Sequence, residues 1–310
     1  MKSSSVVGEN GSVDRGTAER LVLGTAALGL AYGLPSADGT LAAPDESASV
    51  ALIRDAWARG IRCFDTAPAY GEAESRLGCA LPTQGAVWTK FDRRLHPGPW
   101  STALTDSLAG SLQRLGRAHI DVFHWHNWTR AVADEQACAH AWSALRTDAR
   151  IGRLACSTYG VDDALAAVLS GWFSLVQVEA NVLNRSVLRA IGEPARARGV
   201  AIAVRSVFLQ GVLTPKGTHL PAKLSGLQQA RAQCLALAER LGMPLHHLAL
   251  RALLADPDVA YVLIGVDRPQ QLTDALEAAT GSPLPPGVSE TLVEYEPADL
   301  TLTDPRTWAR

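Results

Sequence analysis

The feature that most constrains the fold of this chain is a regular alternation between short apolar runs and longer segments with helical periodicity. The apolar runs read as strands and cover residues 21–25, 61–64, 86–89, 120–125, 154–156, 174–178, 201–204 and 261–264. Their apolar residues are continuous rather than alternating, which is typical of strands buried on both faces of a parallel sheet. Eight strand–helix units in one series predict an α/β protein that closes into a (β/α)8 TIM barrel.

The competing α/β architecture, a doubly wound nucleotide-binding fold, requires G-x-G-x-x-G after its first strand. This chain has GTAALG at 24–29, which lacks the second glycine, and no long polar linker divides it. We therefore expect one barrel domain over residues 19–310, after a polar, disordered leader at 1–18. The Pro- and Gly-containing segment 207–226 is expected to form a loop over one end of the barrel. Asp45 or Ser47 is expected to cap the helix that precedes the second strand.

Composition limits the possible partners of the protein. Over 310 residues the net charge is −2, so there is no electrostatic case for binding nucleic acid or an anionic membrane. No apolar run approaches the roughly 18 residues needed to span a bilayer. The five cysteines are scattered, without C-x-x-C spacing, which favours reduced thiols in a cytoplasmic protein. A small-molecule partner is expected, and the sequence gives no sign of the oligomeric state.

Four polar residues follow three neighbouring predicted strands, where barrel enzymes place their chemistry. Asp65 and Tyr70 follow the second strand, Lys90 the third and His126 the fourth. An ammonium group beside a phenol favours the phenolate and lowers its pKa, and a carboxylate behind the ammonium keeps it charged and oriented. The trio Asp65–Lys90–Tyr70 is therefore predicted to form a tuned general acid. His126 is predicted to fix the direction of the substrate oxygen.

These residues belong to motifs that resemble the aldo-keto reductases. LGTAALG, GIRCFDTAPAYGEAESRLG, WTK, HIDVFHWHN, GRLACSTYG, LVQVEANVLN and IGVDRPQQL occur in the order of that family across nearly the whole chain. RSVFLQG and the terminal DPRTW further resemble a bacterial branch often linked with carbohydrate metabolism. The resemblance implies hydride transfer between a nicotinamide and a carbonyl or alcohol, with Asp65, Tyr70, Lys90 and His126 as the catalytic tetrad and Tyr70 as the proton donor.

The same resemblance implies a set of cofactor-binding residues: Thr25, Ser157, Thr158, Gln177, Arg205, Ser206, Leu209, Gly211, Gly265, Arg268 and Gln271. Within it, Ser157 and Gln177 match positions that hydrogen-bond the carboxamide. The loop 206–211 and the turn at Gly265 match regions that hold the pyrophosphate and adenosine. The chain departs from the family pattern where Arg205 replaces an aromatic ring, which suggests guanidinium stacking instead.

Two adjacent charges bear on the choice of cofactor. Asp267 lies where the family often has a cation for the 2′-phosphate, and its carboxylate would repel that group. Arg268 follows directly and could bind the phosphate bidentately. The resemblance favours NADP(H), the usual cofactor of the family, and NAD(H) stays possible because of Asp267. Ala275 replaces an Asn that commonly contacts adenine.

Several bulky side chains lie on the fourth predicted strand or in the segments after the third and fourth, and are expected to line a substrate pocket. They are Trp100, His124, Trp125 and Trp128. His124 and His126 are two residues apart on one strand face and could begin a zinc site. The later strand ends supply no further histidine, so no metal is expected.

Two other functions stay open at this point. One is a non-redox lyase, dehydratase or epimerase that uses the same acid–base set on a sugar-like substrate. The other is a cofactor-binding regulatory subunit on the same barrel. Retention of all four tetrad residues favours the reductase.

Overall fold

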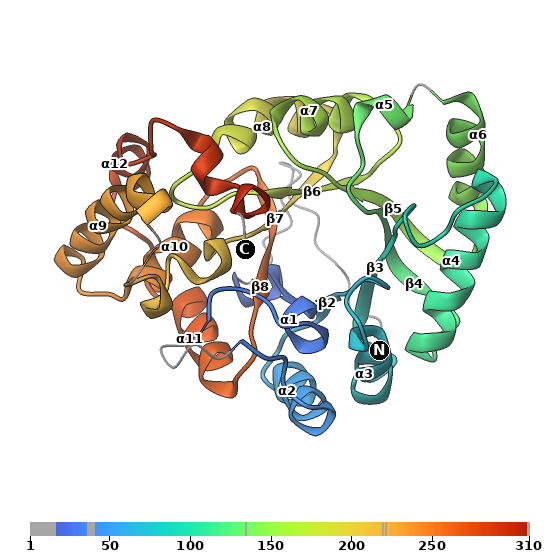
Figure 1. The fold of residues 1–310 in the computed structure, drawn as a ribbon, viewed down its shortest axis with the longest axis horizontal. Coiled ribbons are helices and arrows are strands. Elements are labelled where there is room, and N and C mark those ends of the chain that lie inside the picture. The colour runs from blue at the N-terminus through green and yellow to red at the C-terminus, as the bar shows by residue number, and fades with distance from the viewer. Residues whose placement is uncertain (1–16, 36–40, 134, 219, 221, 309–310) are drawn as a thin grey trace, which may run out of the picture.

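A computed structural model of the protein describes residues 17–35, 41–133, 135–218, 220 and 222–308. Its parallel strands pair in chain order and close into one barrel, confirming the predicted fold (Figure 1). The strands are β1 (Leu21–Gly24), β2 (Cys63–Asp65), β3 (Ala86–Phe91), β4 (Ile120–Trp125), β5 (Ile151–Ser157), β6 (Leu175–Glu179), β7 (Ala201–Arg205) and β8 (Val259–Gly265).

Each predicted strand is present, with ends shifted by a few residues. The largest difference lies in β5, which begins at Ile151 rather than Leu154 because Ile151 pairs with Ile120 of β4. Closure of the barrel is completed by β8, whose residues Val262 to Gly265 pair with β1. Because all eight strands run the same way, their carboxyl ends meet at one rim.

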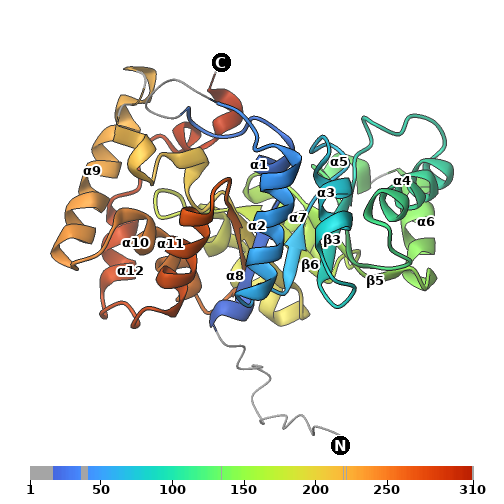
Figure 2. The same cartoon turned by 90° about the horizontal axis from the view of Figure 1, so that it is seen from below.

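The helices surround the strands in both views (Figures 1 and 2). They are α1 (Ala26–Gly29), α2 (Glu46–Ala58), α3 (Ala73–Ala80), α4 (Trp100–Leu115), α5 (Arg130–Ala133), α6 (Gln136–Ala144), α7 (Val161–Leu169), α8 (Ser186–Arg198), α9 (Ser225–Arg240), α10 (Leu245–Leu254), α11 (Pro269–Thr280) and α12 (Val288–Glu294). Asp45 caps α2, as predicted, by accepting a hydrogen bond from the Ala48 amide at 2.7 Å. Gly116 and Gly199 end α4 and α8 in the left-handed conformation that a glycine adopts most easily.

The barrel interior has a small apolar core of its own, separate from the larger layer between strands and helices. Every strand except β2 supplies a buried member: Val22, Trp88, Val122, Ala155, Leu175, Ala203, Tyr261 and Leu263. These side chains fill the barrel below the rim, so the barrel is a packed support and not a pore.

The segment 207–226 has more structure than a plain loop. Its described residues include the turns Leu209–Gly211, Pro215–Thr218 and Ala222–Leu224, and Val212 and Leu213 are buried in a second apolar cluster with α9 and α10. The Leu34 amide, in the segment after α1, donates to the Gln210 carbonyl at 2.8 Å. This bond ties the segment to the rim beside β1.

The structure describes the C-terminal segment up to residue 308, and at the other end of the chain it begins at residue 17. Most of the predicted leader, residues 1–16, lies outside the described residues, and the described chain begins with a 3-10 turn at Thr17–Arg20. The C-terminal segment forms 3-10 turns at Leu300–Thr303 and Pro305–Thr307 on the side of the barrel that carries α1 (Figure 2). Within the described ranges, no helix has the length and apolarity that crossing a membrane demands.

Candidate active site

Asp65 and Lys90 form a buried ion pair at the rim ends of β2 and β3. Lys90 Nζ donates to Asp65 Oδ1 at 2.5 Å and to the Thr66 carbonyl at 2.9 Å. Gln177 Nε2, from β6 across the barrel, donates to Asp65 Oδ2 at 2.9 Å. Burial lowers the pKa of Lys90, and the Asp65 carboxylate opposes that shift. The two charges depend on each other, because removing one would leave the other buried and unpaired.

Tyr70 lies beside this pair, with Lys90 Nζ 5.2 Å from the centroid of its ring. The sequence predicts that the ammonium lowers the phenol pKa, and the structure gives the opposite direction. Burial first, and then the charge of Asp65, raise the pKa of Tyr70 well above 10, while Arg205 acts to lower it. The physical reason is that burial disfavours the phenolate more strongly than the nearby cations favour it. Tyr70 is consequently held in its protonated form.

His126 stands across from Tyr70 and is supported from behind by an acidic residue. The two rings are 6.0 Å apart between centroids and nearly perpendicular. His126 Nδ1 lies 3.4 Å from Asp92 Oδ2, and Arg94 binds the same carboxylate through Nη2 at 2.6 Å. Burial lowers the pKa of His126 while the contact with Asp92 opposes that shift. The imidazole is therefore held neutral at pH 7, with one nitrogen facing Asp92 and the other free for a ligand.

A cavity of about 550 Å³ opens at this rim, and Asp65, Tyr70 and His126 line it together. The structure thus brings three of the four predicted tetrad residues to one cavity, with Lys90 directly behind Asp65. Apolar residues form much of the remaining wall, among them Leu30 and Phe208. An apolar cavity with a few convergent polar groups is typical of small-molecule sites.

Most of the predicted cofactor residues line the same cavity. Those that do are Ser157, Gln177, Arg205, Ser206, Gly211, Gly265, Arg268 and Gln271. Three others support it from behind and do not line it. Thr25 donates its hydroxyl to the Asp65 carbonyl at 3.0 Å, Thr158 donates to the Trp128 carbonyl at 2.9 Å, and Leu209 is buried in the segment after β7.

The donor set of the cavity fits a nicotinamide dinucleotide. At one end the Ser157 hydroxyl and the Gln177 amide can serve a carboxamide. At the other, Lys216 and Arg268 can serve phosphate groups. Between the two ends, Gly211 has a φ of +105°, a conformation that lets backbone approach a ligand closely.

Asp267 is held between two cations in the structure. Arg268 Nε lies 3.0 Å from its Oδ1, and Lys216 Nζ lies 3.8 Å from its Oδ2. All three residues line the cavity, as does Asp274. Asp267 therefore offsets part of the positive charge that a 2′-phosphate would use.

None of the four residues expected to form the substrate pocket is among the described residues that line this cavity. Trp125 and Trp128 are buried in the layer between strands and helices, where Trp125 packs against Trp142 at 5.1 Å between ring centroids. Trp100 packs at the edge of this layer and donates Nε1 to Glu135 at 2.9 Å. His124 points into the barrel interior, where it contacts Trp88. The three tryptophans face the layer between strands and helices, and His124 faces the packed interior of the barrel.

Sequence reasoning missed several residues of the site. Asp92 lies two residues after Lys90, Tyr159 follows the fifth predicted strand, and Lys216 comes from the segment 207–226. Asp92 and Tyr159 had a usable signal, since each follows a predicted strand as Asp65 does. The described residues hold no group of three or more His, Cys, Asp or Glu side chains that could bind a metal ion.

Comparison with known proteins adds a separate line of evidence. A sequence model described as "Aldo/keto reductase family" matches residues 20–294. An NADH-specific methylglyoxal reductase of Escherichia coli (strain K12) is 24% identical, over 84% of this chain and 90% of that protein. A D-threo-aldose 1-dehydrogenase of Pseudomonas sp is 28% identical, over 83% and 90%, and an L-glyceraldehyde 3-phosphate reductase of Escherichia coli (strain K12) is 27% identical, over 74% and 78%.

Proposed function

The chain belongs to the aldo/keto reductase family of nicotinamide-dependent oxidoreductases, and we propose that its rim cavity binds a small carbonyl or alcohol substrate, sugar-like in character, with Tyr70 as general acid and base. The observation that carries the proposal is the meeting of Tyr70, His126 and the Asp65–Lys90 pair at one cavity. Relatives named for methylglyoxal, aldose and glyceraldehyde 3-phosphate support the substrate class.

Each residue of the tetrad has a role that follows from its surroundings. The raised pKa of Tyr70 keeps the phenol protonated, so it can donate a proton to a carbonyl oxygen as negative charge develops there. The neutral imidazole of His126 would hydrogen-bond the same oxygen and fix its direction. Lys90, anchored by Asp65, places a positive charge beside the Tyr70 ring, where it would stabilise the phenolate that remains.

A bound dinucleotide would supply or accept the hydride. We propose that Ser157 and Gln177 hold its carboxamide, and that Ser206, Gly211 and Gly265 approach its phosphates and ribose. Thr25, Thr158 and Leu209 would hold those residues in place from behind. Since Asp65 accepts from Gln177 Nε2, the Gln177 carbonyl oxygen is left to accept from the carboxamide nitrogen.

We propose NADP(H) as the preferred cofactor, with Asp267 limiting that preference. Lys216 and Arg268 provide two cations for a 2′-phosphate, and Gln271 follows on α11. Replacement of Asp267 by Asn would remove the repulsion of that phosphate. We expect Asp267→Asn to tighten NADPH binding by about tenfold, or roughly 1.4 kcal/mol, and to change NADH binding much less.

Separate fluorescence titrations with NADPH and NADH test the proposal. Wild type should bind at least one of them, and Asp267→Asn should raise the ratio of NADH to NADPH dissociation constants. Failure to bind either dinucleotide would favour the non-redox lyase, dehydratase or epimerase. Binding without reduction of any aldehyde, ketose or keto acid would favour a regulatory subunit.

The five free cysteines support a proposed cytoplasmic location.

A further inference from the structure

Arg205 stands out because it places a guanidinium in the wall of the cavity, at the rim end of β7. Its side chain is only 16% exposed. Of the described cations that line the cavity, Lys216 and Arg268 contact Asp267, whereas Arg205 contacts Ser157, on the side of the Asp65–Lys90 pair. Arg205 is therefore the cation that a substrate beside Tyr70 and His126 would meet.

The hydrogen bonds that Arg205 makes within the chain leave much of its capacity unused. One is short, from Nη2 to the Thr158 carbonyl at 2.8 Å. Its contacts with Ser157, Ser206 and Glu179 are all 3.4 Å long. A guanidinium has five N–H donors, and its bonds to anions are normally about 2.7–2.9 Å. A partly buried cation with one short bond is suited to receive an anionic ligand from the cavity.

The plane of Arg205 is held rigidly by an aromatic stack. Its guanidinium carbon lies 3.9 Å from the centroid of the Tyr159 ring, and that of Arg306 lies 3.6 Å from the same centroid. Two planar groups cannot both lie so close on one face of a ring, so the arginines occupy opposite faces. Arg306 belongs to the C-terminal segment and does not line the cavity.

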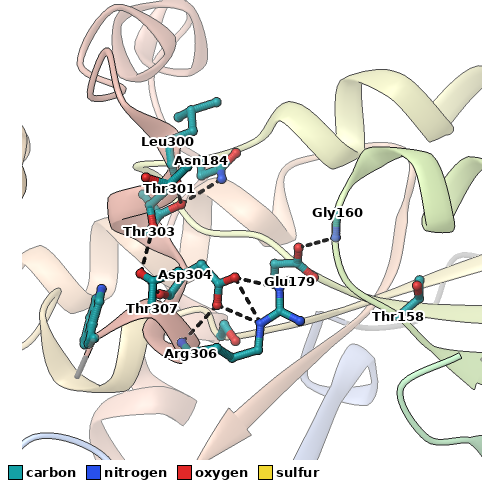
Figure 3. A network of polar contacts seen from close by, with 12 residues as sticks. Thr158, Gly160, Glu179, Asn184, Leu300, Thr301, Thr303, Asp304, Arg306 and Thr307 are labelled. Atoms are coloured by element: carbon teal, nitrogen blue, oxygen red, sulfur yellow. Dashed lines mark hydrogen bonds and ion pairs between the residues drawn. The ribbon is translucent and has the colours of Figure 1, made fainter. Parts of the chain in front are cut away.

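The C-terminal segment is in turn fixed to the rim of the barrel (Figure 3). Asn184 Nδ2, in the segment after β6, donates to Thr303 Oγ1 at 2.8 Å, and within the C-terminal segment Arg306 Nη2 donates to Asp304 at 2.6 Å. Such fixed geometry matters because a preorganised fork loses little conformational entropy when it binds a ligand.

The carboxylates at this end of the cavity have closer partners than Arg205. Asp65 is engaged by Lys90 at 2.5 Å and by Gln177 at 2.9 Å. Within the described part of the chain, the one carboxylate in ion-pair contact with Arg205 is Glu179 at 3.4 Å, and the shorter bond of Glu179 is the one from the Gly160 amide at 2.8 Å. Arg205 is therefore only loosely paired and can bind an incoming anion through its remaining donors.

We propose that Arg205 binds an anionic group of the substrate, so that this enzyme prefers carbonyl compounds that carry a carboxylate or a phosphate. The inference rests on the proposed function, because it assigns a substrate class to the same cavity. A carboxylate or phosphate would take the two-point contact that the guanidinium fork offers.

Steady-state kinetics with matched substrates test the proposal. The carboxylate arm compares 4-formylbenzoate with its neutral isostere 4-formylbenzamide, and the phosphate arm compares glycolaldehyde phosphate with glycolaldehyde. In at least one arm, wild type should show a higher kcat/KM for the anionic member. Arg205→Gln should lower kcat/KM for that member by roughly 10- to 100-fold, mainly through KM, the range expected for a lost charge-assisted bond. Its kcat/KM for the neutral member should fall by a clearly smaller factor.

Arg306→Gln provides a matched control, because it removes the same charge from the opposite face of Tyr159 at a residue that does not itself line the cavity. It should retain the preference for the anionic substrate. Arg205→Lys, which keeps the charge but not the fork, should show an intermediate preference, and it replaces Arg205→Gln if that variant does not fold.

Three outcomes would overturn the inference. One is equal use of anionic and neutral substrates by wild type in both arms, which leaves the proposed oxidoreductase function intact. Another is an equal loss with both members of a pair in Arg205→Gln. The third is weaker dinucleotide binding by Arg205→Gln in a fluorescence titration with an unchanged anion preference, which would assign Arg205 to the cofactor instead. Failure of wild type to bind any dinucleotide is a different result and contradicts the proposed function itself.

Discussion

Lys90 has no exposed surface, yet its ammonium group keeps two close partners, the Asp65 carboxylate and the Thr66 carbonyl. Taking such a charge out of water costs several kcal/mol, and only a close counter-charge and further hydrogen bonds offset it. Here Gln177 adds a bond to the far side of the carboxylate. These short hydrogen bonds hold the ammonium group of Lys90 in one position. An electrostatic role beside Tyr70 requires such a fixed charge.

At the residue scale, Tyr70→Phe tests the proposed general acid. Removing one hydroxyl takes away the proton donor but leaves the ring and the rest of the cavity in place. We expect turnover to fall at least about a hundredfold, the low end for loss of general acid catalysis. The dissociation constant of the dinucleotide should change less than about threefold. Single-turnover kinetics and fluorescence titration measure the two, and unchanged turnover would remove Tyr70 from its proposed role.

At the element scale, the short helix α1 lies unusually close to the turn that carries Tyr70. A Cβ added at Gly29 would lie 1.8 Å from the Tyr70 carbonyl oxygen and 3.0 Å from the Ala73 amide nitrogen. Both are backbone atoms, so the clash cannot be relieved by a side-chain movement. Because residue 29 is a glycine, the segments that follow β1 and β2 can contact each other at the rim.

Gly29→Ala is therefore expected to displace the turn at Tyr70. We expect a loss of about 1–3 kcal/mol in the free energy of unfolding, as for overpacked sites, and a lower turnover. Urea unfolding and steady-state kinetics measure the two effects. Gly110→Ala in α4 is the control, because the new methyl group meets only the flexible side chain of Arg114, at 3.1 Å. Equal stability of the two variants would contradict the steric argument.

At the scale of the whole molecule, the interior of the barrel contains a buried base. His124 pairs with Lys90 across β3 and β4 and is fully buried, and neither ring nitrogen has a hydrogen-bond partner among the described residues. Burial, and then the charge of Lys90, lower the pKa of His124 to about 3. The folded protein thus keeps His124 neutral at pH values where the unfolded chain, with a histidine pKa of about 6.5, takes up a proton.

This difference makes the stability of the protein depend on pH. The contribution of His124 is fully present above about pH 6.5 and is lost as the pH falls from there towards about 3, because the unfolded state binds the extra proton. Between pH 7 and pH 4.5 wild type should lose about 2–3 kcal/mol more than His124→Leu. Urea unfolding of both proteins at the two pH values measures the difference. Parallel losses would show that His124 is not the group that titrates.

Sequence patterns were sufficient to predict the fold because each pattern involves residues that are close together along the chain. Continuous apolar runs indicated the eight strands, and Asp45 marked the start of α2. The same patterns could not orient Trp125 and Trp128, which are as compatible with a pocket wall as with the packing layer outside the barrel. Whether these two side chains face the cavity or the outer packing layer is set by the twist and register of the closed sheet.

By itself, the sequence determined that the chain forms a (β/α)8 barrel and that Asp65, Tyr70, Lys90 and His126 follow strands that end at one rim. Only the tertiary structure decided how these groups act on one another. It raised the pKa of Tyr70 where the isolated trio suggested a decrease, and it brought Arg205, Tyr159 and Arg306 together from three distant segments. The physical reason is that burial and charge compensation depend on everything within a few ångströms of a group, and the order of residues along the chain does not specify those neighbours.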